Sequence, residues 1–250
     1  MIKKNYNESK IIRYLGTGIE SDVYLYDDEG IKTALKLFKD EKVLDNKELK
    51  LELLKEEKLL LKETKLLSKI YRDDRFIGYT SLYDQSEPLI NYFNRSKKIK
   101  LDLLTQIQQK YQELNKREIF IGDFNLENFR VKNGQVRLID IDNFSIDGLP
   151  FDVKDQFMEQ YFSKCSKIDN IDFYSFNFLA LSFMAGIIPS VVLETMNISN
   201  LPKEFNNDRC KKLFTELMKI NDDYKRTVIV NDDGFNDATF IKCMKKGLFE

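Results

Sequence analysis

The chain of 250 residues has little cysteine and no long apolar segment. Its three cysteines are scattered, odd in number and without the paired spacing of a metal site, so we expect reduced thiols and no disulfide framework. No apolar run reaches the roughly 18 residues of a membrane span, and no long apolar region follows the first lysines, as it would in a secretion signal. These absences predict a cytoplasmic protein with no membrane partner.

The sequence also lacks an excess of charge of either sign. Its 40 basic and 41 acidic residues leave a formal net charge of -1 at pH 7. Nucleic-acid binding is favoured by an excess or a patch of positive charge, and nothing in this balance indicates such a partner. The length is sufficient for a well-buried core that is arranged as two lobes of one unit.

A run in the middle of the chain has the spacing of a phosphoryl-transfer site. In residues 121–128, Asp123 and Asn128 are separated by four residues, and a short apolar run farther on ends at Asp140. A transferred phosphate needs a carboxylate for the attacking hydroxyl and hard oxygen ligands for a magnesium ion. The spacing therefore predicts that Asp123 accepts the hydroxyl proton, while Asn128 and Asp140 hold the metal.

Two further elements lie upstream, in the order that such a site requires. A glycine loop lies between two strand-like runs, with Gly16 and Gly18 as points of close backbone approach to phosphate and Ser21 in place of a usual third glycine. In residues 33–38, Lys36 is the only cation of an apolar run, which is the setting of a lysine that pairs α- and β-phosphates. The expected nucleotide contacts are Gly16, Thr17, Gly18, Ser21, Val23 and Lys36.

With these motifs in this order, the chain resembles the protein-kinase-like superfamily. Asp172 opens an apolar helix in a way that is similar to the family's Asp-x-[Trp/Tyr]-Ser helix start, whose Asp braces the backbone of the catalytic loop. The resemblance implies an α+β bilobal fold, with a small antiparallel sheet and one long helix in residues 1–84 and a compact, mainly helical lobe in residues 85–250. It also implies ATP as the phosphate donor and Mg²⁺, or Mn²⁺, as the metal.

Each motif has a simpler explanation when it is taken alone. A single Gly-x-Gly is usually a hairpin turn, a single strand lysine is usually a solvated edge residue, and Asp123 and Asn128 could be turn and cap residues. A calcium loop at Asp140 is disfavoured, because Phe144 takes a ligand position and Gly148 comes too late for the turn. Chance would have to produce the whole ordered set, so the kinase-like interpretation is favoured.

A kinase-like site also needs a helix glutamate that pairs with Lys36. Residues 46–68 lack glycine and proline and are rich in helix formers. Glu56 and Glu63 each have a leucine four residues later on the same helix face, and Glu52 fits only the distance from the lysine. We assign the role to Glu56 and keep the other two open. The near-heptad leucines of this helix are Leu49, Leu53, Leu60 and Leu67.

Other segments have clear secondary-structure signals. Residues 11–38 indicate three strands with a turn at 27–30, and Asn133-Gly134 indicates a hairpin turn. Residues 75–83 indicate the strand that leads into the hinge between lobes, where backbone groups would bind adenine. Helices are expected at 101–117, 178–186 and 208–220, and a further turn at 231–234.

Several positions depart from the protein-kinase pattern. Ile121 and Gly122 stand where many protein kinases have His and Arg, and Asn125 stands where Ser/Thr kinases carry a lysine that touches the transferred phosphate. The resulting Gly-Asp-x-Asn form is similar to that of antibiotic and small-metabolite phosphotransferases. Asp142 replaces the Gly of Asp-Phe-Gly and could help to hold metal or lie on a surface turn. The segment that follows is short and lacks an Ala-Pro-Glu-like anchor, so a conventional peptide groove is not expected.

We therefore expect an ATP- and Mg²⁺-dependent kinase that transfers a γ-phosphate to a hydroxyl, on a protein Ser or Thr rather than on a small molecule. One rival hypothesis is a pseudokinase that acts as a nucleotide-binding interaction module, and another is a small-molecule phosphotransferase of the antibiotic or metabolite type. The polar groups most needed for transfer are all present, which favours an enzyme over a scaffold. The expected catalytic residues are Asp123, Lys36 and Asn125, and the expected metal ligands are Asn128, Asp140 and Asp142.

Overall fold

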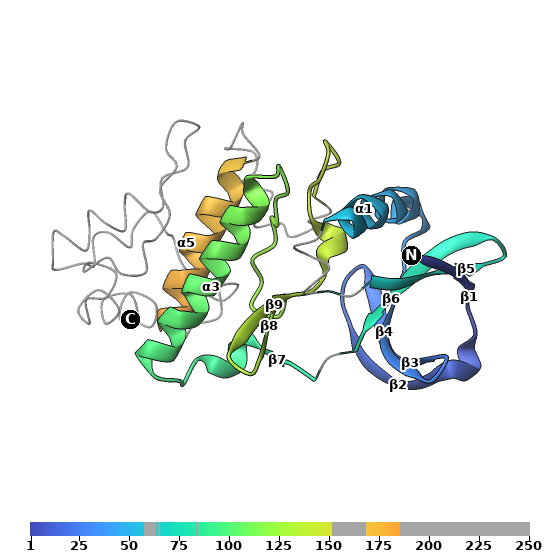
Figure 1. Cartoon of the computed structure of the whole chain (residues 1–250), viewed down its shortest axis with the longest axis horizontal. Coiled ribbons are helices and arrows are strands. Elements are labelled where there is room, and N and C mark those ends of the chain that lie inside the picture. The colour runs from blue at the N-terminus through green and yellow to red at the C-terminus, as the bar shows by residue number, and fades with distance from the viewer. Residues whose placement is uncertain (58–63, 65, 84, 152–168, 186–250) are drawn as a thin grey trace, which may run out of the picture. The chain divides into compact units, whose positions relative to one another are not determined.

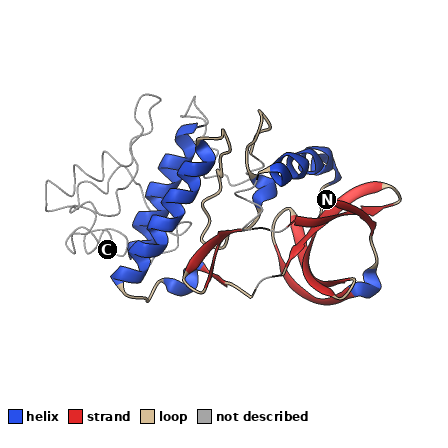
Figure 2. Cartoon of the chain, viewed as in Figure 1, coloured by secondary structure: helices blue, strands red, loops and turns tan. Residues whose placement is uncertain are grey.

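The structure is a computed structural model that describes residues 1–57, 64, 66–83, 85–151 and 169–185 (Figure 1). These residues form a mixed α+β protein with a six-stranded sheet and a few helices (Figure 2). They divide into two compact units. None of the helices in these ranges is both long and apolar enough to cross a lipid bilayer. The first unit contains Met1–Ser86, Arg137–Asp142 and Ile146–Pro150, and the second contains Glu87–Val136, Asn143–Ser145, Phe151 and the helix at Asp169–Ala185.

The sheet of the first unit has the strand order β1-β5-β6-β4-β3-β2. Neighbouring strands are antiparallel except β1 and β5, which pair in parallel, so the prediction of an antiparallel sheet is wrong at β1. The sheet is curled, because Lys4 of β1 lies 2.6 Å from Asp28 of β3 although β5, β6 and β4 lie between these strands (Figure 1). The strands are β1 (Ile2–Asn5), β2 (Ile11–Thr17), β3 (Ser21–Asp28), β4 (Ile31–Phe38), β5 (Leu66–Arg72) and β6 (Arg75–Leu82).

The three strands predicted in residues 11–38 are confirmed as β2, β3 and β4. The turn between β3 and β4 forms because Asp27 Oδ1 accepts a hydrogen bond from Gly30 N at 2.6 Å, and Gly30 has a φ of 84°, which glycine adopts without strain. The resulting register places Lys36 opposite Tyr79 of β6. Lys36 therefore lies on an interior strand of the sheet rather than at an edge.

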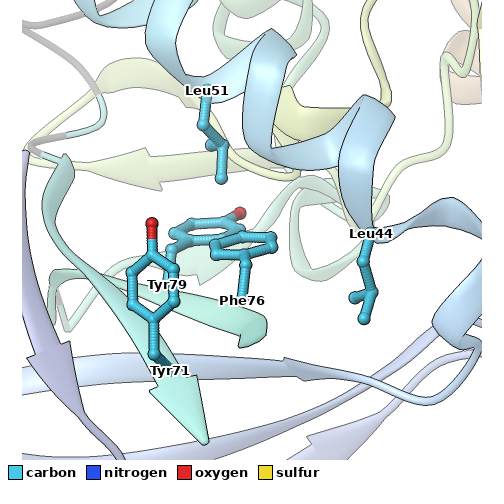
Figure 3. Close-up of a cluster of buried hydrophobic side chains, with 5 residues drawn as sticks. All are labelled: Leu44, Leu51, Tyr71, Phe76 and Tyr79. Carbon is cyan, nitrogen blue, oxygen red and sulfur yellow. The ribbon is translucent and has the colours of Figure 1, made fainter. Parts of the chain in front are cut away.

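Helix α1 (Leu44–Glu56) packs on this sheet through leucines and aromatic rings. Figure 3 shows Leu44 and Leu51 on the helix, with Tyr71, Phe76 and Tyr79 of β5 and β6 in the same cluster. The rings of Tyr71 and Phe76 meet edge to face with their centroids 5.9 Å apart. Burial of each large apolar side chain contributes about 1.5–3 kcal/mol, so this core holds α1 against the sheet.

The helix differs from the prediction in length and in its buried face. Residues 66–68, which were expected to be helical, begin strand β5, and Leu49, expected on the apolar face, is 49% exposed. The near-heptad leucines were misleading, because the side chains that point inward follow a three- and four-residue spacing from Leu44 onward. The buried residues of α1 are Leu44, Lys47, Lys50, Leu51 and Leu54.

The second unit is built around α3 (Lys97–Asn115) and α5 (Asp169–Ala185), which lie side by side (Figure 1). Tyr111 of α3 is completely buried, and its ring centroid lies 5.0 Å from that of Phe176 on α5. Lys100 Nζ donates to the carbonyl oxygen of Phe183 at 3.1 Å, close to the C-terminal end of α5, where a cation is favoured. The helices predicted at these places are confirmed, although α5 begins earlier than expected.

Short strands and turns complete this part of the chain. Asn133 and Gly134 have φ values of 51° and 75°, and the hairpin that they were predicted to form is present between β8 and β9. The helix predicted at 208–220 and the turn at 231–234 lie outside the described residues. The remaining elements are β7 (Glu87–Pro88), β8 (Phe129–Lys132), β9 (Gln135–Leu138) and the 3₁₀ turns η1 (Glu8–Lys10), η2 (Glu41–Val43), η3 (Leu89–Tyr92) and η4 (Ile141–Asn143).

Candidate functional site

Lys36 is a buried cation on β4. Its side-chain Nζ donates to Asp142 Oδ1 at 2.9 Å and to Asp140 Oδ1 at 3.0 Å, although Asp140 is 104 residues away in the chain. Burial alone would lower the pKa of Lys36, but the charges of Asp142 and Asp140 outweigh burial and raise the pKa above its usual value. Lys36 is therefore held in its charged form, which is the form that a phosphate-binding lysine needs.

Asp142 is the carboxylate at the centre of this cluster. It lies in η4 and is completely buried, its Oδ1 accepts a hydrogen bond from the Tyr79 hydroxyl at 2.7 Å, and its Oδ2 lies 3.1 Å from Lys47 Nζ. Burial would raise the pKa of Asp142, but the charges of Lys36 and Lys47 hold it well below the usual range. The alternative of a surface turn is therefore wrong. Metal binding by Asp142 stays a prediction, although its carboxylate already contacts two lysines and a tyrosine.

Asp140 differs from Asp142 because part of its side chain faces solvent. The side chain is 38% exposed, against 0% for Asp142. Its backbone φ is 55°, a left-handed conformation that is uncommon outside glycine and is often found at functional sites. Asp140 can therefore offer an oxygen to a hard cation while it contacts Lys36. Within the described ranges, no group of three or more acidic, cysteine or histidine side chains is placed to hold a metal, so this role stays a prediction.

The helix glutamate that was expected to pair with Lys36 is not found in the described part of the chain. Glu56 is exposed at the end of α1, and Glu52 lies 2.5 Å from Lys69 of β5. Glu63, the third candidate, lies outside the described residues. In the described part of the chain Lys36 pairs with Asp140 and Asp142, and Glu48 and Glu52 of α1 pair with Lys69, so a role of Glu56 beside Lys36 stays a prediction.

In place of a glutamate, α1 presents Lys47 toward the aspartate cluster. Lys47 is completely buried, and its Nζ lies 3.0 Å from Glu20 Oε2 as well as 3.1 Å from Asp142 Oδ2. Lys50, one turn later and equally buried, donates to the carbonyl oxygen of Pro150. The charge that the helix brings to the site is thus positive rather than negative.

The glycine loop is a tight turn whose polar groups contact one another. Gly18 N donates to Ser21 O at 2.8 Å, and the Thr17 hydroxyl donates to Asp22 Oδ1 at 2.6 Å. Lys39 directly follows β4, and its Nζ donates to Thr17 Oγ1 at 2.6 Å and to Gly18 O at 2.9 Å. These bonds give the loop between β2 and β3 a defined shape.

Gly16 and Gly18 are not required by the packing of the described chain. A Cβ atom at Gly16 would meet nothing within 4 Å, and one at Gly18 would meet only Ser21 O at 3.9 Å. Val23, farther along β3, pairs in register with Lys36. The open space at the two glycines is what a close phosphate would need. Contacts of this loop and of Val23 with nucleotide stay predictions.

The loop of residues 121–128 lies in the second unit and joins Asp123 to Asn128. Asn128 Nδ2 donates to Asp123 Oδ2 at 2.9 Å, which orients a half-buried carboxylate. Asn125 is exposed, and its Oδ1 accepts a hydrogen bond from Glu127 N at 3.1 Å, so its side chain makes a local turn. The geometry suits the expected orientation of Asp123, and the catalytic roles of Asp123 and Asn125 stay predictions.

Asp172 braces this loop as the resemblance implied. Its carboxylate accepts hydrogen bonds from Ile121 N at 2.9 Å and from Gly122 N at 2.8 Å. Burial raises the pKa of Asp172 to about 7, even though the two backbone donors lower it. The expected contact between the start of α5 and the loop backbone is therefore confirmed.

The same loop contains a glycine that its surroundings require. Gly122 has a φ of 69°, and a Cβ atom there would lie 2.3 Å from Cδ1 of the Phe151 ring. A larger residue would be strained in this conformation and would collide with the ring. Glycine is thus the residue that fits at the position where many protein kinases carry arginine.

Sequence reasoning missed Lys47, Glu20, Tyr79 and Gly78. Lys47 could have been noticed, because it interrupts the buried stripe that begins at Leu44, and a cation in such a stripe needs an acidic partner. Gly78 on β6 is needed because a Cβ atom there would lie 2.1 Å from Lys36 O. Nothing in the sequence points to Glu20 or Tyr79, since their role depends on the tertiary contact with Lys47 or Asp142.

Comparison with known proteins does not extend the resemblance. No protein-family model matches the sequence. A search of curated proteins also found no match.

Proposed function

We propose that this chain is an ATP-dependent phosphotransferase with the bilobal fold of the protein-kinase-like superfamily. The observation that carries the proposal is the pair between Lys36 and Asp140. Each residue was selected from a separate motif, and in the first unit their side chains lie 3.0 Å apart. The Asp172 brace on the loop that holds Asp123 supports the proposal independently, because it lies in the second unit.

The first unit would carry the groups that bind nucleotide. Lys36 has three N–H donors, and two are engaged by Asp140 and Asp142, so the third is suited to an anionic phosphate oxygen. The glycine loop has the space for close backbone approach. Asp140 would hold Mg²⁺, or Mn²⁺, because it supplies a hard oxygen ligand, and the ion would neutralise charge on the phosphates.

The second unit would carry the group that activates the acceptor. Asp123 would orient the attacking hydroxyl and accept its proton, and the Asn128 amide would hold the carboxylate in place. Asn125 would donate a hydrogen bond to the transferred phosphate without adding charge. The acceptor that we favour is a protein Ser or Thr hydroxyl, and a small-molecule hydroxyl is the alternative.

A nucleotide-binding pseudokinase is the second candidate, and one observation favours it. Thr17, Gly18 and Ser21 make hydrogen bonds within their own turn, and Lys39 adds two more, so the loop is closed on itself. A loop that stays closed could retain nucleotide binding elsewhere in the site and lose transfer.

The test is transfer of labelled γ-phosphate from Mg-ATP, with wild type and Asp123→Asn compared at equal concentration. Acceptors would be the protein itself, a cell lysate and a panel of small hydroxyl compounds, and nucleotide binding would be titrated separately with a fluorescent ATP analogue. The proposal expects label only with wild type and similar affinity in both proteins. Binding without transfer would identify the pseudokinase, and the absence of binding would refute the proposal.

A further inference from the structure

Lys47 connects two parts of the first unit that the proposed function uses. Its Nζ lies 3.0 Å from Glu20 Oε2, on the glycine loop, and 3.1 Å from Asp142 Oδ2. It also donates to the main-chain oxygen of Asp142 at 3.4 Å. Since Asp142 is the completely buried partner of Lys36, one ammonium group of α1 lies between the loop and the phosphate-binding lysine.

The position of α1 does not depend on Lys47 alone. On another face of the helix, Glu48 and Glu52 lie 2.7 and 2.5 Å from Lys69 of β5, and Tyr71 donates a hydrogen bond to Glu48. The leucine core adds apolar contacts. The helix is thus fixed to the sheet by other groups, so loss of the Lys47 charge should act locally.

Packing alone does not explain a lysine at this position. Leu44, Leu51 and Leu54 show that the buried face of α1 is otherwise suited to apolar side chains. Burying an ammonium carries a desolvation penalty of several kcal/mol, which an unbranched apolar residue of similar length would avoid. Glu20 and Asp142 offset this penalty, because both approach Lys47 within ion-pair distance. These two contacts favour a charge at this position.

We propose that Lys47 is a positioning residue of the nucleotide site, which holds Lys36 through Asp142 and holds the glycine loop through Glu20. The roles of Lys36 and of the loop in this inference rest on the proposed function. Within the described residues, Lys47 of α1 contacts Lys36 through an intermediate aspartate, whereas the family resemblance led us to expect a direct glutamate–lysine pair.

The test uses three full-length variants with nucleotide absent in the first stage. Lys47→Met removes the charge and keeps the length of the side chain. Glu20→Gln removes only the partner on the loop. Lys50→Met is the matched control, because Lys50 is an equally buried lysine on the same helix that donates a hydrogen bond to Pro150 O. The readouts are hydrogen exchange of the backbone amides of residues 16–21 and the side-chain ammonium NMR signal of Lys36.

The expected results separate the contact of Lys47 with Glu20 from its contact with Asp142. Lys47→Met should accelerate loop exchange about tenfold, the equivalent of one charged hydrogen bond, and should shift the Lys36 signal. Glu20→Gln should accelerate loop exchange without shifting that signal, and Lys50→Met should change neither. In a second stage, Lys47→Met should weaken ATP binding about tenfold or more, and Lys50→Met should not.

Equal effects of Lys47→Met and Lys50→Met on both readouts would reduce Lys47 to a structural residue and overturn the proposal. If Lys47→Met does not fold, Glu20→Gln becomes the deciding variant. Unchanged loop exchange in Glu20→Gln would overturn the proposal that Lys47 holds the glycine loop through Glu20. A wild type that binds no ATP refutes the proposed function instead. The first-stage results would be unaffected by that outcome, because they are measured without nucleotide.

Discussion

Replacing Asp142 with Asn removes one negative charge from a cluster that contains two buried lysines. The carboxylate is completely buried and lies 2.9 Å from Lys36 Nζ, 3.1 Å from Lys47 Nζ and 2.7 Å from the Tyr79 hydroxyl. The amide keeps the size of the side chain and one acceptor oxygen, but its NH₂ group has to face a donor. The variant therefore tests charge and hydrogen bonding rather than volume.

The size of the stability loss in Asp142→Asn depends on the lysine charges that stay buried after the substitution. Removing one partner of a buried ion pair destabilises a protein by about 3–5 kcal/mol, because the other charge stays buried without compensation. Here each lysine keeps one acidic partner, Asp140 for Lys36 and Glu20 for Lys47, so we expect a value in the lower half of that range. A typical domain has about 5–15 kcal/mol of unfolding free energy, so the variant should lose a large part of it.

The assay is urea unfolding followed by far-ultraviolet circular dichroism, since the chain has no tryptophan. Glu41→Gln is the control, because Glu41 pairs with Arg75 at the surface and its loss should change stability by about 0–1 kcal/mol. The double variant Lys47→Met/Asp142→Asn should be about 1–3 kcal/mol more stable than the two single effects added together would predict, because both charges of this ion pair are then gone. An Asp142→Asn effect as small as that of the control would refute the reasoning.

The pH dependence of the same carboxylate has a defined sign. The pKa of Asp142 is lowered on folding, so its stabilising effect is fully present above the ordinary value of 3.8 and is lost progressively as the pH falls below that value toward the lower pKa of the folded state. Urea titrations should therefore show a constant difference between wild type and Asp142→Asn above about pH 5 and a difference that begins to narrow below about pH 4. Gly122→Ala should destabilise the chain by about 2 kcal/mol or more, through backbone strain and the clash with Phe151. Gly134→Ala is the control in the same titration, because Gly134 also has a positive φ but a Cβ atom there would meet nothing within 4 Å, and it should cost only about 1 kcal/mol. Gly16→Ala should leave thermal stability nearly unchanged and weaken ATP binding, and unchanged binding would remove the glycine loop from the nucleotide site.

Local chemistry was enough to predict the strands and turns at the start of the sheet. The turn at Asp27 and Gly30 has a side-chain hydrogen bond and a positive φ at Gly30, and the turn at Asn133 and Gly134 has positive φ values, and all of these depend only on neighbouring residues. The parallel strand β1 was missed, because its pairing partner β5 lies more than sixty residues away and its sequence carries no turn signal. Long-range pairing of this kind cannot be inferred from local propensity.

Strand β5 was missed for a related reason. Leu66 and Leu67 are good helix formers, and they follow a segment with the same composition, so propensity extended the helix through them. In the structure these residues pair with β6, where Lys69 lies opposite Tyr79. Tertiary pairing overrode helix propensity at this point, as it often does in short segments.

The sequence also could not show which charged side chains of α1 face the candidate site. The sequence of α1 contains alternating lysines and glutamates, and reversing which set faces the core changes neither the composition nor the helix propensity. The ion-pair partners decide which charged side chains of α1 face the core. Lys69 of β5 pairs with the glutamates, and the completely buried Asp142 pairs with Lys47. A buried anion next to a glutamate would have raised the pKa of one of them, so a second acid could not have served Asp142. The lysine that α1 turns toward this cluster is therefore a consequence of the second aspartate of Asp140-Ile141-Asp142, a residue that the Asp-Phe-Gly pattern of protein kinases does not contain.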